Sequence, residues 1–293
     1  MANGTSRSAK LPNQGDLLGD RFRLGSIIAR GAMGVVFNAR DEKTGEELAV
    51  KILPPMANGV QARERFLREM ELTSTVHHPN VVRTVEIGLH EGTRPYIAME
   101  KLVGQTLAQS LRKQTKLSIV HAVLMLSQVA LALEGSHKVG VLHRDIKPGN
   151  IFLADRGAVL FDFGLSIDSR RITRLTSDEM TVGTPGYMAP EQILEGALDA
   201  RSDIYGATAC AFEALTGERP IAPHATSVDQ VFEAIVAQVP PVPSTLRSNV
   251  PPSVDRLLIH GLAKKPADRF QTAGELHDAC IDAMNGIPDE EEA

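Results

Sequence analysis

The sequence has only two cysteines, Cys210 and Cys280, in 293 residues. They lie far apart, and neither has a cysteine or histidine nearby at metal-ligand spacing, so the sequence indicates neither a disulfide framework nor a zinc site. An excess of basic charge is also missing, since the net charge is -5 and the pI is about 6.0. This charge balance argues against nucleic acid and anionic membranes as binding partners.

Long hydrophobic runs are scarce as well. The start, MANGTSRSAK, lacks the apolar core of a signal peptide. The longest apolar stretch, from Ala122 to Leu133, is interrupted by Ser127 and Gln128. It is shorter than the roughly 20 residues that a membrane-spanning helix needs. We therefore expect a soluble, cytoplasmic protein with no membrane segment in this chain.

The chain does contain enough apolar residues, 43%, for a substantial core. Residues 1–20 are polar and residues 285–293 are acidic, so we expect flexible tails flanking a folded domain at 21–284. Periodicity of two dominates the first part of that domain, and helical periodicity dominates the rest. The expected strands are 22–29, 34–40, 47–53, 81–90 and 94–100, and the expected helices are 61–76, 117–140, 201–215, 228–236, 253–262 and 272–284.

These patterns predict an α+β fold with two lobes. A small antiparallel, β-rich N-lobe with one helix covers about 21–99, and a larger, mostly helical C-lobe covers 105–284. The hinge between them is expected at 100–104, where the character of the sequence changes.

The most informative segment is His143-Arg144-Asp145-Ile146-Lys147-Pro148-Gly149-Asn150, which is followed by two short strands and Asp162-Phe163-Gly164. Asp145, Asn150 and Asp162 all fall at strand or loop ends, where side chains can converge. Two of them can serve as oxygen ligands for Mg²⁺, and the third can take up a hydroxyl proton. A turn-forming role explains any one of them alone, but not their joint spacing.

Two weaker features precede this segment. Gly31 and Gly34 lie between the first two strands, where backbone amides could approach phosphate oxygens, although a simple hairpin turn also explains them. Lys51 alternates with Ala49 on one face of a strand, and burying a lone ammonium group is costly. Glu69, on the following helix, is a candidate counter-charge.

From Phe22 to Ile281 the chain resembles the bacterial, eukaryotic-like (Hanks-type) Ser/Thr protein kinases, and the motifs above occur in the expected order. The resemblance implies the two-lobed protein kinase fold and transfer of a phosphoryl group from ATP to Ser or Thr of protein substrates. It also implies Mg²⁺, or Mn²⁺ in its place, as the metal cofactor.

The resemblance assigns roles to individual residues. Asp145 corresponds to the catalytic base, Lys147 approaches the γ-phosphate, and Lys51 contacts the α- and β-phosphates and pairs with Glu69. Asn150 acts in catalysis and holds metal ions together with Asp162. The ATP-binding set comprises Ile28, Ala29, Gly31, Gly34, Val36, Ala49, Lys51, the gatekeeper Met99, the hinge residues Glu100 and Leu102, and Phe152.

The same resemblance bears on substrates and regulation. Lys147 and the substrate-docking Thr184 favour Ser/Thr over Tyr specificity. An arginine beside the base, here Arg144, is typical of kinases whose activation segment becomes ordered when it is phosphorylated. Self-association would serve autophosphorylation in trans. The candidate phosphosites are Thr173, Thr176, Ser177 and Thr181.

Further structural roles are implied for Glu191 and Arg269, which resemble an ion pair, and for Asp203, which resembles the residue that braces the catalytic loop. The sequence also departs from the family pattern. Ala29 replaces the first glycine of the phosphate loop, while Thr73 and Thr84 stand where apolar residues are usual.

Two alternatives to an active protein kinase remain. A pseudokinase keeps the fold without turnover, but its usual sign is loss of Lys51, Asp145, Asn150 or Asp162, and all four are present. A kinase for small metabolites shares the aspartates, but generally lacks the segment from Gly183 to Glu191.

Overall fold

The computed structural model describes residues 11–31, 34–55, 60–163, 184–194 and 196–287. The chain divides into two compact units, the first formed by residues 1–77 and 82–103 and the second by 78–81 and 104–293. The first unit is β-rich with one helix and the second is mostly helical, so the predicted α+β class is confirmed.

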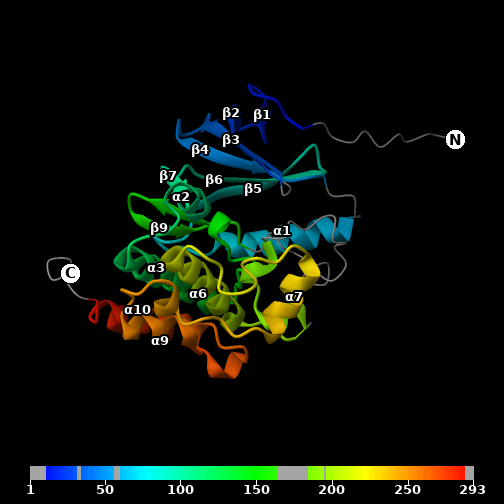
Figure 1. Ribbon diagram of the computed structural model, residues 1–293. Helices are drawn as coiled ribbons and strands as arrows, with labels where there is room; N and C mark the ends of the chain where they lie inside the picture. Colours follow the sequence, from blue (N-terminus) through cyan, green and yellow to red (C-terminus); the bar gives the residue numbers. More distant parts are fainter. Residues whose placement is uncertain (1–10, 32–33, 56–59, 164–183, 195, 288–293) are drawn as a thin grey trace. The chain divides into compact units, whose positions relative to one another are not determined.

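The first unit is built on an antiparallel sheet of six strands in the order β1-β2-β3-β4-β6-β5, drawn in blue and cyan in Figure 1. Alternation of side chains along β4 explains its packing, because Leu48, Val50 and Ile52 join one hydrophobic cluster whereas Ala49 and Lys51 do not. The elements are β1 Leu17–Leu18, β2 Phe22–Gly31, β3 Gly34–Asp41, β4 Glu47–Ile52, α1 Val60–Ser74, β5 Thr84–His90 and β6 Arg94–Glu100.

The segment before Phe22 corrects one expectation. The tail predicted for residues 1–20 is wrong for residues 11–20, because β1 pairs with β2 and Leu18 is fully buried. Leu11 also packs against the same cluster. Leu11 and Leu18 therefore attach this segment to the sheet.

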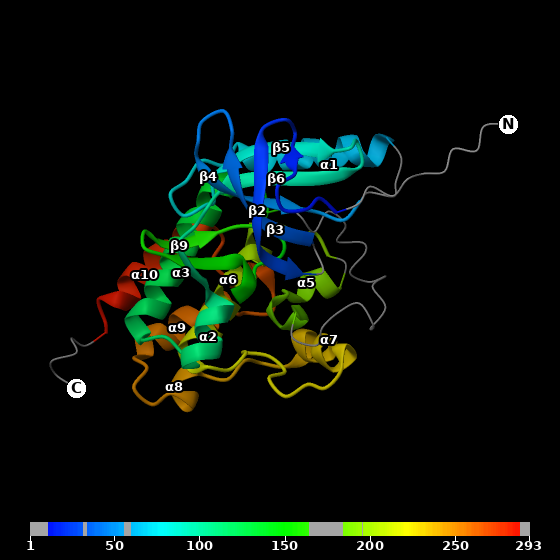
Figure 2. The ribbon, with the colours of Figure 1, turned by 90° about the horizontal axis from the view of Figure 1, so that it is seen from above.

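The second unit is organised around helix α3. Ser118 caps its start by accepting a hydrogen bond from the His121 N–H. Helices α6 and α10 pack against α3, and Figure 2 shows α3 and α10 side by side. The elements are β7 Gly104–Thr106, α2 Leu107–Gln114, α3 Ile119–Lys138, η1 Pro148–Asn150, β8 Ile151–Ala154, β9 Gly157–Leu160, η2 Thr184–Tyr187, α5 Pro190–Ile193, α6 Ala200–Thr216, α7 Val228–Ala237, α8 Pro243–Leu246, α9 Pro252–Gly261, η3 Pro266–Asp268 and α10 Ala273–Met284.

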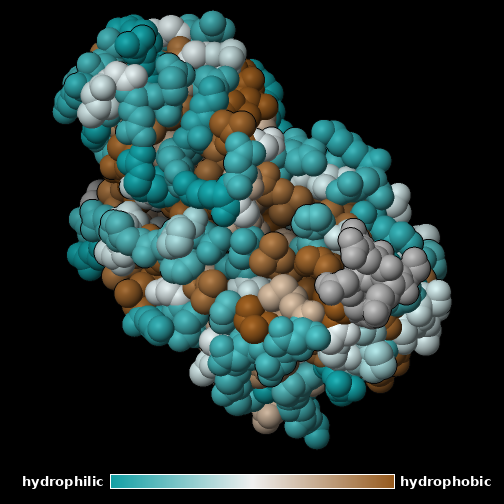
Figure 3. Space-filling view, turned by 90° about the vertical axis from the view of Figure 1, so that its left-hand side faces the viewer, coloured by the Kyte–Doolittle hydropathy of each residue, from teal (hydrophilic) through white to brown (hydrophobic). Residues whose placement is uncertain are grey.

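Within the described part of the chain, α3 is the single helix long and apolar enough, by length and composition, to cross a membrane. Of its most apolar window, 56% is buried inside the structure, as in the core helix of a globular fold. The face drawn in Figure 3 is mostly hydrophilic, with smaller hydrophobic areas. Such exposed apolar side chains are ordinary on a folded protein.

Candidate active site

The loop between α3 and β8 is held from below by Asp203 of α6, whose side chain is 2% exposed. Its Oδ2 accepts from the His143 N–H at 2.8 Å, and its Oδ1 accepts from the Arg144 N–H at 2.8 Å. The Nε2 of His137 lies 2.9 Å from Oδ2. A buried carboxylate needs such partners, so Asp203 has the bracing role that the sequence predicts.

The backbone of this loop is unusual at Arg144, where φ is +66°. Asp162 has a similar value, +65°. Non-glycine residues rarely adopt this conformation, and they keep it only where surrounding contacts impose it. Such positions concentrate at functional sites.

Three predicted site residues lie together at the end of the loop. Lys147 Nζ donates to Asp145 Oδ2 at 2.7 Å. Asn150 Nδ2 donates to the Asp145 carbonyl oxygen at 2.8 Å and to Oδ2 at 3.2 Å. Both side-chain contacts end on Oδ2, so the two carboxylate oxygens of Asp145 have different surroundings.

Asn150 and Asp162 lie at the same end of the β8–β9 hairpin, because the Phe161 N–H donates to the Asn150 carbonyl oxygen at 3.2 Å. Since Nδ2 of Asn150 contacts Asp145, its Oδ1 is the atom suited to ligate a cation. Across the described residues, no group of three or more His, Cys, Asp or Glu side chains could hold a metal by itself. One amide and one carboxylate therefore fit a magnesium ion that takes its other ligands from phosphate and water.

His143 connects this loop to the strand end before Asp162. Its Nε2 lies 3.0 Å from the Phe161 carbonyl oxygen, and its Nδ1 lies 3.3 Å from the Asp145 N–H. A carbonyl only accepts and an amide N–H only donates, so the proton is on Nε2. The ring also packs on Phe163, with the centroids 4.6 Å apart.

The predicted nucleotide residues of the first unit share one face of the sheet. Val36 on β3 is paired with Lys51 on β4, and Ala49 is paired with Met99 on β6. None of these four belongs to the cluster on the opposite face. Lys51 is 6% exposed, as expected for an inward-facing lysine. Its predicted partner Glu69 lies on α1, but the side chain of Glu69 is outside the described part.

The hairpin joining β2 and β3 carries the remaining phosphate-loop residues. Gly31 pairs with Gly34, and Ala29 pairs with Val36. Gly34 has φ of +127°, and a Cβ there would collide with the Ile52 carbonyl oxygen, so glycine is required. Ile28 is 49% exposed on β2.

The other residues predicted to contact adenine are Glu100, Leu102 and Phe152. Glu100 closes β6, and its N–H donates to the Arg83 carbonyl oxygen at 3.0 Å. Leu102 follows in irregular chain. Phe152 lies on β8 of the second unit, with its ring edge-on to Phe161 at 6.3 Å.

The segment Ala189-Pro190-Glu191 is anchored by a bidentate ion pair. Arg269 Nη1 and Nη2 donate to the two Glu191 carboxylate oxygens at 2.7 and 2.9 Å, and Ser202 Oγ donates to Oε1 at 2.7 Å. Burial raises the pKa of Glu191, but the bonds from Arg269 and Ser202 outweigh it, so the pKa lies below its usual value. The predicted Glu191–Arg269 pair is present.

Comparison with known proteins identifies the family. Residues 22–280 match the protein kinase domain. The chain belongs to the protein kinase family. Among its relatives are the serine/threonine-protein kinase PknA of Mycobacterium tuberculosis, 34% identical over 92% of this chain, and PksC of Streptomyces coelicolor, 36% identical over 90%. The chain spans 62% and 49% of the lengths of these two kinases.

A solved structure gives the same family. The kinase domain of M. tuberculosis PknI is 27% identical, with a TM-score of 0.76, and the alignment covers 94% of this chain and all of that domain. The predicted resemblance to bacterial Ser/Thr protein kinases is thus confirmed. Membership in this family implies ATP and a divalent metal ion as cofactors.

Several kinase predictions fall outside the described residues. The phosphosite candidates Thr173, Thr176, Ser177 and Thr181 all do. The backbone of Thr184 is described as the start of η2, but its side chain is not, so its docking role stays a prediction.

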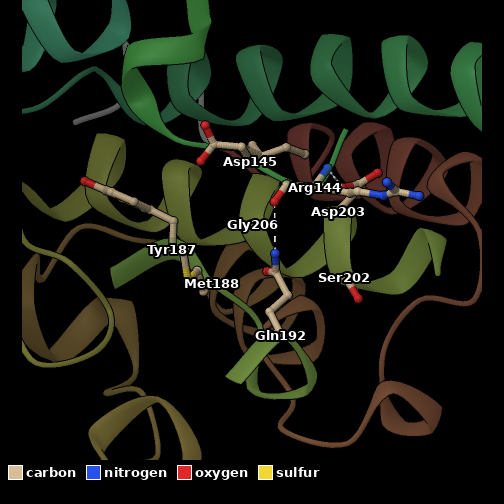
Figure 4. A pocket seen from close by; sticks show the side chains of 9 residues that line it. Arg144, Asp145, Tyr187, Met188, Gln192, Ser202, Asp203 and Gly206 are labelled. Carbon is tan, nitrogen blue, oxygen red and sulfur yellow. Dashed lines mark hydrogen bonds between the residues drawn. The ribbon is translucent and has the colours of Figure 1, made fainter. Parts of the chain in front are cut away.

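One site residue was missed at the sequence level. Gln192 of α5 donates from Nε2 to the Arg144 carbonyl oxygen at 2.9 Å (Figure 4). Its Oε1 accepts from the Ala189 N–H at 2.9 Å. The available signal was its place three residues after a helix N-cap, where Gln often bonds back to the cap N–H. That signal does not point to the catalytic loop.

Proposed function

We propose that this kinase-family chain is an active Ser/Thr protein kinase of bacterial signalling, which transfers the γ-phosphoryl group of ATP to Ser or Thr of cytoplasmic proteins. The observation that carries the proposal is the contact set of Asp145, whose Oδ2 is bonded by both Lys147 and Asn150. A scaffold without turnover has no need for a carboxylate held in this way.

Chemistry at this site follows from that arrangement. With Oδ2 fixed, Oδ1 of Asp145 accepts the proton of the attacking hydroxyl. The hydroxyl oxygen bonds to the γ-phosphorus as the bond between that phosphorus and the β–γ bridging oxygen breaks, which releases ADP. The Lys147 ammonium, 2.7 Å from the base, adds positive charge where the transferred group would carry negative charge. Phosphoryl transfer depends mainly on such positioning and charge neutralisation.

The metal in this proposal is Mg²⁺, held by Asn150 Oδ1 and Asp162, with Mn²⁺ as a substitute. When bound, it neutralises phosphate charge. Val36, Ala49 and Met99 would contact adenine, with Glu100 and Leu102 supplying backbone hydrogen bonds and Lys51 the α- and β-phosphates. The pair with Glu69 is part of the same proposal.

Regulation is proposed through Arg144, whose side chain is exposed beside the base. It is suited to pair with a phosphorylated activation-segment residue among Thr173, Thr176, Ser177 and Thr181. Transient self-association would allow one copy to phosphorylate another.

The test is transfer of labelled γ-phosphate from ATP to a Ser- and Thr-containing basic protein. Asp145→Asn keeps the shape and removes the base, and the loss of general-base catalysis predicts a fall in kcat of about 10²- to 10⁴-fold. Asp155→Asn, at an exposed turn residue after β8, is the matched control and should stay at the wild-type rate.

Equal transfer by wild type and Asp145→Asn would refute the catalytic assignment. Absence of transfer by the wild type, with ATP still bound, would favour the pseudokinase alternative. Phosphoamino-acid analysis of the product should give phosphoserine or phosphothreonine.

A further inference from the structure

We propose that Gln192 is a positioning residue for the catalytic base, because it holds the peptide group that joins Arg144 to Asp145. The proposal rests on the kinase function above. It assigns to α5, the four-residue helix that follows η2, a role in orienting the carboxylate that accepts the substrate proton.

The peptide group between Arg144 and Asp145 is bonded on both sides. Its carbonyl accepts from Gln192 Nε2 at 2.9 Å, and its N–H donates to His143 Nδ1 at 3.3 Å. The N–H of the preceding peptide is bonded to Asp203 at 2.8 Å. The φ of +66° at Arg144 is unfavourable for a non-glycine residue, so these contacts must offset its energetic cost.

The orientation of the Gln192 amide is fixed by its two partners. The Ala189 N–H can only donate and the Arg144 carbonyl can only accept, so Oε1 must face Ala189 and Nε2 must face Arg144. Gln192 is 9% exposed, so water competes little for either bond. Because both ends of the amide are bonded, the Gln192 side chain is held in one conformation against the loop.

Helix α5 is itself anchored to the rest of the second unit. Glu191 precedes Gln192 and is held by Arg269, whose side chain is fully buried. The chain of contacts therefore runs from Arg269 through Glu191 and Gln192 to the Arg144 carbonyl, and the next residue is Asp145. Figure 4 shows Gln192 and Asp203 contacting Arg144 from different sides in the cavity they line with Tyr187 and Asp145.

Gln192→Glu removes the hydrogen bond to Arg144 and keeps the one from Ala189. Glutamate keeps the oxygen that accepts from the Ala189 N–H, but as a carboxylate it cannot donate to Arg144. Once protonated, it can donate again. Gln192→Met has similar length and makes neither bond. Gln109→Glu is the matched control, because Gln109 holds the equivalent position in α2 and its Oε1 accepts from the Thr106 N–H at 2.8 Å.

We expect kcat of Gln192→Glu at pH 8 to fall about tenfold, the scale of one buried hydrogen bond, with KM for ATP within about twofold. As the pH falls towards 5.5, the ratio of its kcat to that of the wild type should rise several-fold, because the glutamic acid regains a donor. Gln192→Met should be slow at every pH, and Gln109→Glu should match the wild type. Asp145, Asp203, Tyr187 and Arg144 line the same cavity, so kcat of each variant is compared with that of the wild type at every pH.

A kcat within twofold of wild type for both Gln192 variants would overturn the proposal. So would a fall in kcat for Gln192→Glu that shows no recovery at low pH, since this would indicate a general packing defect. The Asp145 amide ¹⁵N shift gives a readout that does not need turnover. It should move in Gln192→Glu, return on acidification, and stay unchanged in Gln109→Glu. If the wild type transferred no phosphate, this shift would still decide the positioning role separately from the kinase function.

Discussion

At the scale of single residues, the second unit buries a carboxylate next to a tyrosine. Tyr187 donates its hydroxyl to Glu213 Oε2 at 2.6 Å. Burial raises the pKa of Glu213, and the bond from Tyr187 and the charge of Arg219 offset only part of that shift. At neutral pH the folded protein therefore bears the cost of a partly desolvated charge.

Glu213→Gln should change how stability depends on pH. Because the folded pKa is raised, Glu213 contributes stability that is fully present below its unfolded value, about 4.3, and is lost as pH rises through the folded pKa. Glutamine keeps an acceptor for Tyr187 without the charge, so the stability of Glu213→Gln relative to the wild type should increase as the pH rises.

Urea unfolding of both proteins from pH 5 to 8 measures this difference. The control is Glu218→Gln, at an exposed position five residues after Glu213. Its stability relative to the wild type should not change with pH in this way. Parallel stability curves for wild type and Glu213→Gln would contradict the effect assigned to burial.

Which residue contacts could be predicted follows from their separation in the sequence. Asp145, Lys147 and Asn150 lie within one loop, so their spacing alone indicates that they meet. Gln192 meets Arg144 across 48 residues, and Tyr187 meets Glu213 across 26. Those contacts depend on how α5 and α6 pack, which no local pattern in the sequence specifies.

At the scale of elements, the longer strands and helices were predicted because their periodicity is strong. Helix α2 was missed, although Thr106 and Gln109 form a capping box that marks its start. Strand β5 begins at Thr84 rather than at residue 81, because Val81 instead forms a bridge with Leu160 in the second unit. Strand β1, with two residues, is too short to have a period.

The anchoring of α5 gives a prediction at this scale. Arg269→Met should destabilise the protein by about 3–5 kcal/mol, because it leaves the Glu191 carboxylate buried without its partner. Adding Glu191→Gln should recover part of the loss. The matched control is Arg23→Met, which breaks the exposed pair with Glu42 and should cost less than about 1 kcal/mol. Denaturant midpoints measure the stability of all three variants, and similar costs for the Arg269 and Arg23 changes would contradict the assigned role.

At the scale of the whole molecule, the proposed nucleotide contacts Val36, Ala49, Lys51 and Met99 belong to the first unit. Phe152 and the proposed metal ligands Asn150 and Asp162 belong to the second unit. A ligand that contacts only the folded chain stabilises it by RT ln(1 + [L]/Kd), about 2.7 kcal/mol at a hundredfold excess over Kd. Binding should therefore be visible as a rise in Tm without any turnover.

We expect a non-hydrolysable ATP analogue with Mg²⁺ to raise Tm of the wild type and of Asp145→Asn alike, since Asp145 is assigned to the base and not to the metal. Chelation of Mg²⁺, or Asp162→Asn, should remove most of the rise, because phosphate charge would then lack its cation. Thermal denaturation with and without chelator provides the measurement. An equal rise in Asp162→Asn and wild type would show that the nucleotide binds without the metal site, and would separate the adenine-binding assignment in the first unit from the metal assignment in the second.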